Sequence, residues 1–169
     1  MNRTYLSLGS NRGNREQFIG QALSLINGEV GIVERQSPVY ETAPWGFADP
    51  VPFLNCVAEV STLLAPEEVM AAILKIEKKL GRKRPPANRG KTGKKQFLSR
   101  TIDIDILFYN DLVLLEPDLT IPHPEISRRR FVLIPLCALD PGFRHPVLSE
   151  TVSELLDHCS DRSDVRLLK

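Results

Sequence analysis

The sequence predicts an α+β fold, in a split βαβ arrangement with both helices on one face of a mainly antiparallel sheet. Two observations predict this fold. The expected elements follow the order strand, helix, strand, strand, helix, strand. The 169 residues also fit one domain, and no repeat or low-complexity linker divides them. We therefore expect a single domain over residues 1–169, with a C-terminal extension after the last strand.

Three strands and one helix are expected in the first part of the chain. Residues 4–8 are typical of a short strand. The helix after them begins behind Asn14, a favourable N-cap, and is expected to end at Gly28. Residues 32–40 and 53–62 are predicted as the second and third strands.

The helix that begins at Pro66 is the clearest element of the sequence. Proline costs no hydrogen bond at the first helical position, acidic residues follow it, and lysines precede Gly81, which ends the helix. Its apolar stripe consists of Val69, Ile73, Ile76 and Leu80. The remaining predicted elements are a strand over 102–109, an extended segment over 112–115, and helical patches over 131–139 and 152–156.

The composition argues against several classes of protein. A net charge of +1 provides no overall attraction for nucleic acid or for a membrane surface, and no run of about 18 apolar residues predicts a membrane span. The three cysteines are far apart and include no Cys-x-x-Cys pair, so we expect neither a disulfide framework nor a zinc site. The N-terminus has no signal-peptide core, and the expected location is the cytoplasm.

Two aspartates in the predicted strand over 102–109 form the sharpest local signal. Side chains alternate along a strand, so Asp103 and Asp105 should share one face, with their Cα atoms about 6.5–7 Å apart. The opposite face is expected to carry Ile102, Ile104, Ile106 and Phe108. Mg²⁺ would offset the repulsion between the acids, since it is often held by one or two carboxylates and substrate phosphates. The alternative is a solvated strand face.

Basic residues surround this acidic pair. Eight of the 22 lysines and arginines lie within residues 82–100, which contain no acid, so 14 basic residues accompany 21 acidic ones in the rest of the chain. A positive segment beside two carboxylates suits a polyphosphate, because arginine stabilises the charge that develops during phosphoryl transfer. Arg82 and Arg100 are the best candidates because they lie at the ends of the segment. The alternative is a solvated flap.

A long loop at 42–52 joins two predicted strands and carries three prolines and two aromatic residues. Long loops of this kind are often functional. Phe53 and Asn55 follow the loop, and together they could hold a flat heterocycle, with the ring stacking and the amide reading a polar edge. Core packing of Phe53 and a local hydrogen bond of Asn55 are the alternatives.

In combination, these motifs closely resemble the 6-hydroxymethyl-7,8-dihydropterin pyrophosphokinase family of the folate pathway. The resemblance extends from about residue 5 to residue 141. The motifs that carry it are Gly9-Ser10-Asn11, Tyr40-Glu41-Thr42-Ala43-Pro44, Phe53-Leu54-Asn55, Gly81-Arg82, Arg100-Thr101-Ile102-Asp103-Ile104-Asp105, Pro122-His123-Pro124, Arg129 and Phe131-Val132-Leu133-Ile134-Pro135-Leu136. The resemblance implies a ferredoxin-like βαββαβ sandwich. It also implies transfer of the diphosphate of ATP to the hydroxymethyl group of the pterin, which gives AMP and the pterin diphosphate.

The resemblance also implies roles for individual residues. The implied catalytic residues are Arg82, Arg100, Asp103 and Asp105, of which the two aspartates would hold two Mg²⁺ ions. The residues implied for ATP are Arg82, Arg84, Arg100, Thr120, His123 and Arg129. The residues implied for the pterin are Phe53 and Phe131, which would sandwich it, and Asn55 with the main chain of Thr42, Ala43 and Trp45, which would read its edges.

Two positions depart from the usual pattern of the family. Phe97 stands where the family commonly has tryptophan, and Pro124 stands where it has tyrosine after the histidine. The expected partners are ATP and the dihydropterin, with no nucleic acid and no membrane, and the expected oligomeric state is a monomer.

Two other functions are alternatives. A different Mg²⁺-dependent nucleotide transferase or hydrolase could use the same acids, and its product would be ADP instead of AMP. Split βαβ sheets also bind RNA through aromatic residues on their central strands. The strand over 102–109 presents acids in that place.

Overall fold

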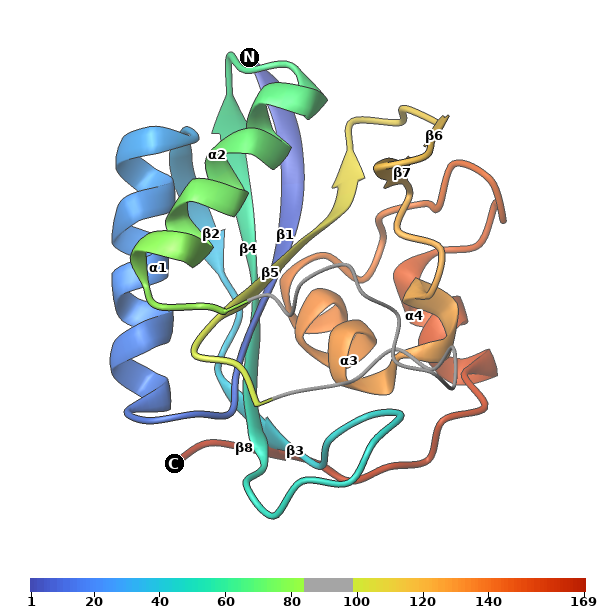
Figure 1. Cartoon of the computed structure of the whole chain (residues 1–169). Coiled ribbons are helices and arrows are strands. Elements are labelled where there is room, and N and C mark those ends of the chain that lie inside the picture. Colours follow the sequence, from blue (N-terminus) through green and yellow to red (C-terminus); the bar gives the residue numbers. More distant parts are fainter. Residues whose placement is uncertain (84–98) are drawn as a thin grey trace.

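The computed structural model describes residues 1–83 and 99–169, and it confirms the predicted α+β fold (Figure 1). The strands are β1 (Asn2–Ser10), β2 (Ile32–Gln36), β3 (Tyr40–Thr42), β4 (Phe53–Thr62), β5 (Asp103–Tyr109), β6 (Leu114–Glu116), β7 (Leu119–Ile121) and β8 (Val165–Leu167). The α-helices are α1 (Arg15–Glu29), α2 (Pro66–Lys79), α3 (Arg130–Leu139) and α4 (Val152–His158), and a 3-10 turn spans Ile126–Arg128. Among the helices of the described ranges, none has the length and apolar character to cross a membrane.

The main sheet runs in the order β5, β1, β4, β3, β8, and β2 also pairs with β4. Every pairing in it is antiparallel. β5 therefore lies at an edge, beside β1. Its outer side is covered by two contacts: Glu77 accepts a hydrogen bond from the Ile104 N–H at 2.9 Å, and the His123 N–H donates to the carbonyl of Leu107 at 3.0 Å. Such contacts protect an edge strand from pairing with another chain.

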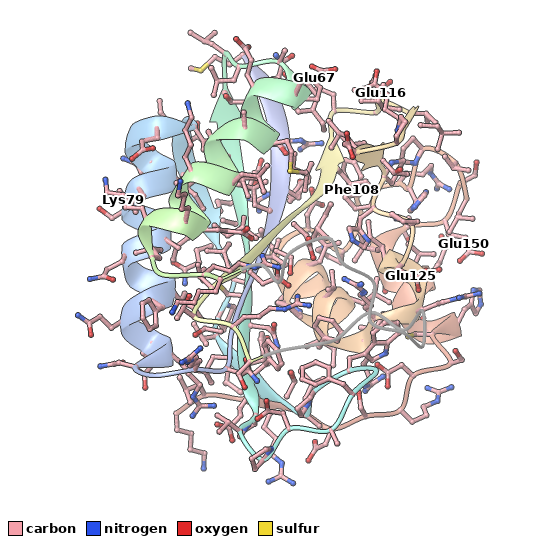
Figure 2. The ribbon with its side chains drawn as sticks, in the orientation of Figure 1. Glu67, Lys79, Phe108, Glu116, Glu125 and Glu150 are labelled. Carbon is pink, nitrogen blue, oxygen red and sulfur yellow. The ribbon has the colours of Figure 1, made fainter. Side chains whose placement is uncertain are left out.

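The helices α1 and α2 cover one face of the sheet (Figure 1). Ile26 of α1 and Ile73 of α2 are buried against Leu8 and other apolar residues of the strands. Figure 2 labels Glu67 and Lys79 near the two ends of α2, where the charges complement the helix dipole. This half of the molecule is the split βαβ unit that the periodicity predicted.

The C-terminal extension covers the opposite face of the sheet. α3 packs on β4, α4 packs on α3, and β8 pairs with β3. A second apolar cluster forms there, and its members include Tyr5, Val57, Phe108 and Leu133. Both faces of the central strands are therefore buried.

The prediction that Phe108 shares a face with Ile104 and Ile106 was wrong. The pairing of β1 with β5 shifts register between Tyr5, which lies opposite Phe108, and Leu6, which lies opposite Ile106. The extra residue is a β-bulge, and it reverses the alternation of the strand. Phe108 consequently joins the cluster on the α3 face, where its ring lies 4.6 Å from that of Phe143 (Figure 2).

Three predicted boundaries also differ from the structure. The strand expected over 32–40 is divided into β2 and β3. Between them, the Ser37 N–H still donates to the Val57 carbonyl at 2.8 Å, but the Ser37 hydroxyl accepts the Val57 N–H at 2.9 Å. Helix α1 continues through Gly28 to Glu29, and the N–H of Val30 donates to the carbonyl of Ile26 at its end. The extended segment over 112–115 is part of a β6–β7 hairpin outside the main sheet.

Candidate active site

The sheet register places Asp103, Gly9 and Asn55 in one row across three neighbouring strands. Gly9 on β1 lies opposite Asp103 on β5 and also opposite Asn55 on β4. Residues directly opposite one another share a face of the sheet, so a carboxylate and an amide flank a residue that has no side chain. Two strand spacings separate them, or about 10 Å. A flat ligand on Asn55 would therefore lie close to a group held at Asp103.

Two guanidinium groups hold the carboxylate of Asp103. The Nη1 atom of Arg82 donates to Oδ1, and the Nη1 atom of Arg100 donates to Oδ2. The side chains are largely buried, with exposed fractions of 12% for Arg82 and 18% for Asp103. The two arginines at the ends of the basic segment therefore meet at one acid, although they lie 18 positions apart in the chain.

The second acid, Asp105, has more distant basic partners. Its Oδ2 lies 3.5 Å from Nη1 of Arg129 and 3.9 Å from Nε2 of His123. Burial, and after it the negative charge of Asp103, raises the pKa of Asp105 to about 6, although the charge of Arg129 acts in the opposite direction. The side chain keeps an exposed fraction of 36%, so a ligand can reach it. Asp105 is thus an incompletely neutralised acid beside a neutralised one.

His123 is a neutral hydrogen-bond donor at this site. Burial and the charge of Arg129 lower its pKa to about 4. Its Nδ1 lies 3.2 Å from the Glu125 N–H and accepts that hydrogen bond, so the proton of the neutral ring is on Nε2. That N–H group is the one on the side of Asp105. It can donate to a phosphate oxygen without carrying a charge.

Two loops hold Arg100 and the residue before it in place. Asn11, which follows β1 and is almost fully buried, accepts the Arg100 N–H at 2.7 Å, and its own N–H donates to the carbonyl of Arg100 at 3.0 Å. Ser99 donates to the carboxylate of Asp49 at 2.6 Å, and this hydrogen bond lowers the pKa of Asp49. The loop at 42–52 is thus joined to the residue that precedes Arg100.

Three of the predicted pterin residues lie where the end of β3 pairs with the start of β4: Thr42, Phe53 and Asn55. Asn55 donates to the hydroxyl of Thr42 at 2.7 Å, and both residues are buried. Phe53 lies directly opposite Thr42, and its ring makes an edge contact with that of Phe47 at 6.1 Å. An ideal Cβ atom on Gly9 would lie 2.8 Å from Asn55 Oδ1. Only glycine therefore leaves the amide in this place.

Aromatic residues from the loop and from α3 meet around Arg129. The rings of Trp45 and Phe131 have centroids 6.3 Å apart. The guanidinium of Arg129 lies 5.1 Å from the centroid of Trp45 and 5.8 Å from that of Phe131. Its Nε is buried and has no hydrogen-bond partner among residues 1–83 and 99–169. A buried donor of this kind beside aromatic rings suits an anionic or heteroaromatic ligand.

The structure does not bring every predicted residue into this cluster. Ala43 is exposed in the loop. Thr120 lies on the β6–β7 hairpin opposite Leu115, three residues before His123, and within the described ranges no side-chain hydrogen bond joins it to the aspartates. The predictions for Arg84 and Phe97 lie outside the described residues.

Two residues of the cluster were not predicted as site residues. Glu77 belongs to α2, is almost fully buried, and accepts a hydrogen bond from Arg82. Its signal was a charged residue four positions after Ile73, within the apolar stripe of the helix. Asn11 belongs to Gly9-Ser10-Asn11, one of the motifs that carry the resemblance, but no role in the site was predicted for it.

The two aspartates fit a magnesium ion by the chemistry of their donor atoms. In residues 1–83 and 99–169, no group of three or more His, Cys, Asp or Glu side chains converges as a metal cage. Asp103 and Asp105 would supply carboxylate oxygens and leave the other positions to phosphates and water, as Mg²⁺ prefers. Guanidinium groups around a carboxylate pair, next to a cluster of aromatic rings, can bind a polyphosphate beside a flat heterocycle and transfer a phosphoryl group between them.

Comparisons with known proteins agree with this chemistry. The sequence matches the family described as 7,8-dihydro-6-hydroxymethylpterin-pyrophosphokinase (HPPK) over residues 5–141. The 2-amino-4-hydroxy-6-hydroxymethyldihydropteridine pyrophosphokinase of Aquifex aeolicus is 39% identical over 154 residues, which cover 91% of this chain and 90% of that protein. The enzyme of the same name from Bacillus subtilis is 37% identical over 139 residues, covering 82% of this chain and 78% of that protein.

A solved structure supports the fold. The crystal structure of wild-type Plasmodium falciparum HPPK-DHPS with SDX-DHP aligns with a TM-score of 0.72 and 20% identity. The alignment covers 93% of this chain but only 43% of that chain, so this chain spans less than half of the Plasmodium protein.

Proposed function

This chain belongs to the 7,8-dihydro-6-hydroxymethylpterin-pyrophosphokinase family and transfers the pyrophosphoryl group of ATP to hydroxymethyldihydropterin in folate biosynthesis, and we propose that the cluster around Asp103 and Asp105 is its active site. One observation carries this proposal: the row in which Gly9 separates Asp103 from Asn55. In this row Asp103 would serve the phosphates and Asn55 the heterocycle, on one face of the sheet and two strands apart.

In this proposal, the hydroxyl oxygen of the pterin forms a bond to the β-phosphorus of ATP. The bond from that phosphorus to the oxygen it shares with the α-phosphate breaks, and AMP leaves. Asp103 and Asp105 would hold Mg²⁺, as two ions, and the metal would neutralise part of the charge of the phosphates. Arg82 and Arg100 stabilise the charge that develops on the transferred group, since both guanidiniums already converge on Asp103.

The nucleotide and the pterin have separate groups of side chains. His123 and Arg129 face Asp105 and would donate to the phosphates of ATP. The resemblance adds Arg84 and Thr120 to the ATP residues, and it adds the main chain of Ala43 to the pterin residues. The pterin would stack between Phe53 and Phe131, with Asn55, Thr42 and Trp45 at its edges.

The test is a product analysis with ATP and 6-hydroxymethyl-7,8-dihydropterin. The wild-type chain should form AMP and the pterin diphosphate in equal amounts, with no ADP. EDTA should stop the reaction, and added Mg²⁺ should restore it. Formation of ADP would favour a kinase or a hydrolase that uses the same acids, and unchanged turnover in EDTA would rule out the magnesium site.

The proposal also describes a single domain that acts as a monomer in the cytoplasm. All the side chains of the proposed site come from one chain, which supports a monomer. ATP, its co-substrate, is a metabolite of the cell interior, which supports the location. Light scattering during size-exclusion chromatography tests the oligomeric state. A dimer that persists at nanomolar concentration would contradict it.

A further inference from the structure

Glu77 is a buried acid in the apolar stripe of α2. Its side chain has an exposed fraction of 2%, and the next buried residues on that stripe are Val69, Ile73 and Ile76. A buried carboxylate is costly unless a cation and hydrogen bonds compensate for its lost hydration. An apolar residue would continue the stripe but would leave the buried Ile104 N–H without this acceptor, and a neutral amide could supply an acceptor without a charge.

Two of the groups that compensate Glu77 belong to the proposed active site. Its Oε1 accepts a hydrogen bond from Nη1 of Arg82 and another from the main-chain N–H of Ile104 at 2.9 Å. Ile104 stands between the two aspartates on β5. One oxygen atom therefore contacts both the guanidinium that faces the phosphates and the strand segment that carries Asp103 and Asp105.

Arg82 is shared between two acids with different surroundings. The same Nη1 donates to Glu77 and to Asp103. Asp103 also accepts from Arg100, and its oxygens are those that a cation would bind in the proposed function. If Asp103 bound a cation, Glu77 would still hold Arg82 from the interior side. The position of the Arg82 guanidinium would then depend on Glu77 more than on Asp103.

We propose that Glu77 is a positioning residue, which holds Arg82 in place for the pyrophosphoryl transfer while Asp103 binds its ligand. This inference rests on the proposed function of the Asp103 cluster. Glu77 does not touch the substrates in this role. Its effect on the reaction passes through Arg82, and it should therefore vanish when Arg82 is absent.

The test is a double-mutant cycle of Glu77→Gln and Arg82→Ala, with kcat, both KM values and thermal unfolding measured for each variant. Glutamine keeps a carbonyl oxygen for the Ile104 N–H but loses the charge that pairs with Arg82. In the wild-type background, Glu77→Gln should lower kcat by roughly tenfold or more, with both KM values changed by less than about twofold. In the Arg82→Ala background, it should lower kcat by less than about twofold.

A control on the same helix is available. Glu67 is exposed at the first turn of α2, and Glu67→Gln should leave kcat within about twofold of wild type (Figure 2). Glu77→Leu removes both hydrogen bonds, so a loss of thermal stability in that variant alone separates support of the strand from support of Arg82.

Different outcomes overturn different claims. An equal loss of kcat from Glu77→Gln in both backgrounds, or full activity of Glu77→Gln, would overturn the positioning role of Glu77 and leave the proposed site intact. Full AMP formation by Arg82→Ala would instead remove Arg82 from the proposed site, and the positioning role would end with it.

Discussion

Asp103 and Asp105 leave the same face of β5 two residues apart, but their charges are balanced to different degrees. Asp103 accepts hydrogen bonds from both Arg82 and Arg100. Asp105 lies 3.5 Å from Arg129 and beside a neutral histidine, and its pKa is raised to about 6. The two aspartates have the same side chain, but their charges therefore affect the stability of the folded state in opposite directions. One is stabilised by its partners, and the other is an ionised group that its surroundings disfavour.

The first prediction compares Asp103→Asn with Asp105→Asn. A folded-state pKa above the usual value near 3.8 means that ionised Asp105 costs stability at pH 7.5, and that this cost disappears as the pH falls through 6 toward 3.8. Asp105→Asn should therefore raise the melting temperature by a few degrees at most, because solvent screens a side chain that is about a third exposed. Asp103→Asn should lower the unfolding free energy by about 1–3 kcal/mol, since asparagine keeps one acceptor oxygen but loses the charge and the second oxygen that pair with the two guanidiniums.

Thermal unfolding at pH 7.5 without divalent cations measures both effects. Neither variant should form AMP, so the pair also separates stability from activity. An Asp105→Asn protein that melts below wild type would show that Asp105 is fully compensated, contrary to the partners described above.

The second prediction concerns the close approach at Gly9. The Cβ atom of an alanine there would lie 2.8 Å from Asn55 Oδ1 and 3.5 Å from the Phe53 ring. Asn55 is held by Thr42, so Gly9→Ala should displace the amide and weaken pterin binding by about tenfold or more, with the affinity for an ATP analogue unchanged.

Isothermal calorimetry with each ligand provides the measurement. The matched control is Gly20→Ala, in α1, where an added Cβ meets no atom within 4 Å. That change should stabilise the helix by up to about 1 kcal/mol and leave both affinities as they are. Unaltered pterin affinity in Gly9→Ala would mean that Asn55 does not read the ring.

The third prediction tests the proposed stacking of the pterin on Phe131. Phe131→Ala should weaken pterin binding by about 1–3 kcal/mol, because a heterocycle loses one stacking face. Calorimetry with an ATP analogue present measures it. Since Phe131 also contacts Trp45 and Arg129, thermal unfolding should accompany the titration. A variant that binds the pterin as tightly as wild type would restrict Phe131 to packing.

The fourth prediction concerns His145, a buried histidine that is not part of the proposed site. His145 Nδ1 accepts the N–H groups of Val147 and Leu148 at 3.2 and 3.1 Å, and burial lowers its pKa although Glu150 opposes the shift. A lowered pKa for a base means that the unfolded chain binds the proton more readily. The stabilisation from His145 is therefore complete above about pH 7.5 and is lost as the pH falls below about 6.5.

Urea unfolding at pH 7.5 and at pH 5.5 checks this dependence. His145→Asn keeps an acceptor without a proton to gain, so the variant should lose less stability than wild type between the two pH values. The exposed His158 serves as control, and His158→Asn should follow the wild-type curve. Identical pH curves for wild type and His145→Asn would contradict the prediction.

Local patterns in the sequence predicted much of this protein. Alternation identified β4 with both its ends, helical spacing identified α2, and the pair at 103 and 105 was expected on one strand face. These features depend on periodicities within a few residues, which the chain carries before it folds. The motif resemblance led to the same family that the comparisons show.

Tertiary structure decided where those pieces meet. The bulge in β5 that moves Phe108 to the other face, the row that joins Asp103 to Asn55 across Gly9, and the approach of Glu77 to Arg82 all depend on registers and packing between distant segments. No local pattern encodes a register between strands that lie about a hundred residues apart. The sequence by itself determined which residues could form the site, and long-range strand pairing determined which of them stand together, because cross-strand neighbours are chosen by the packing of the whole sheet.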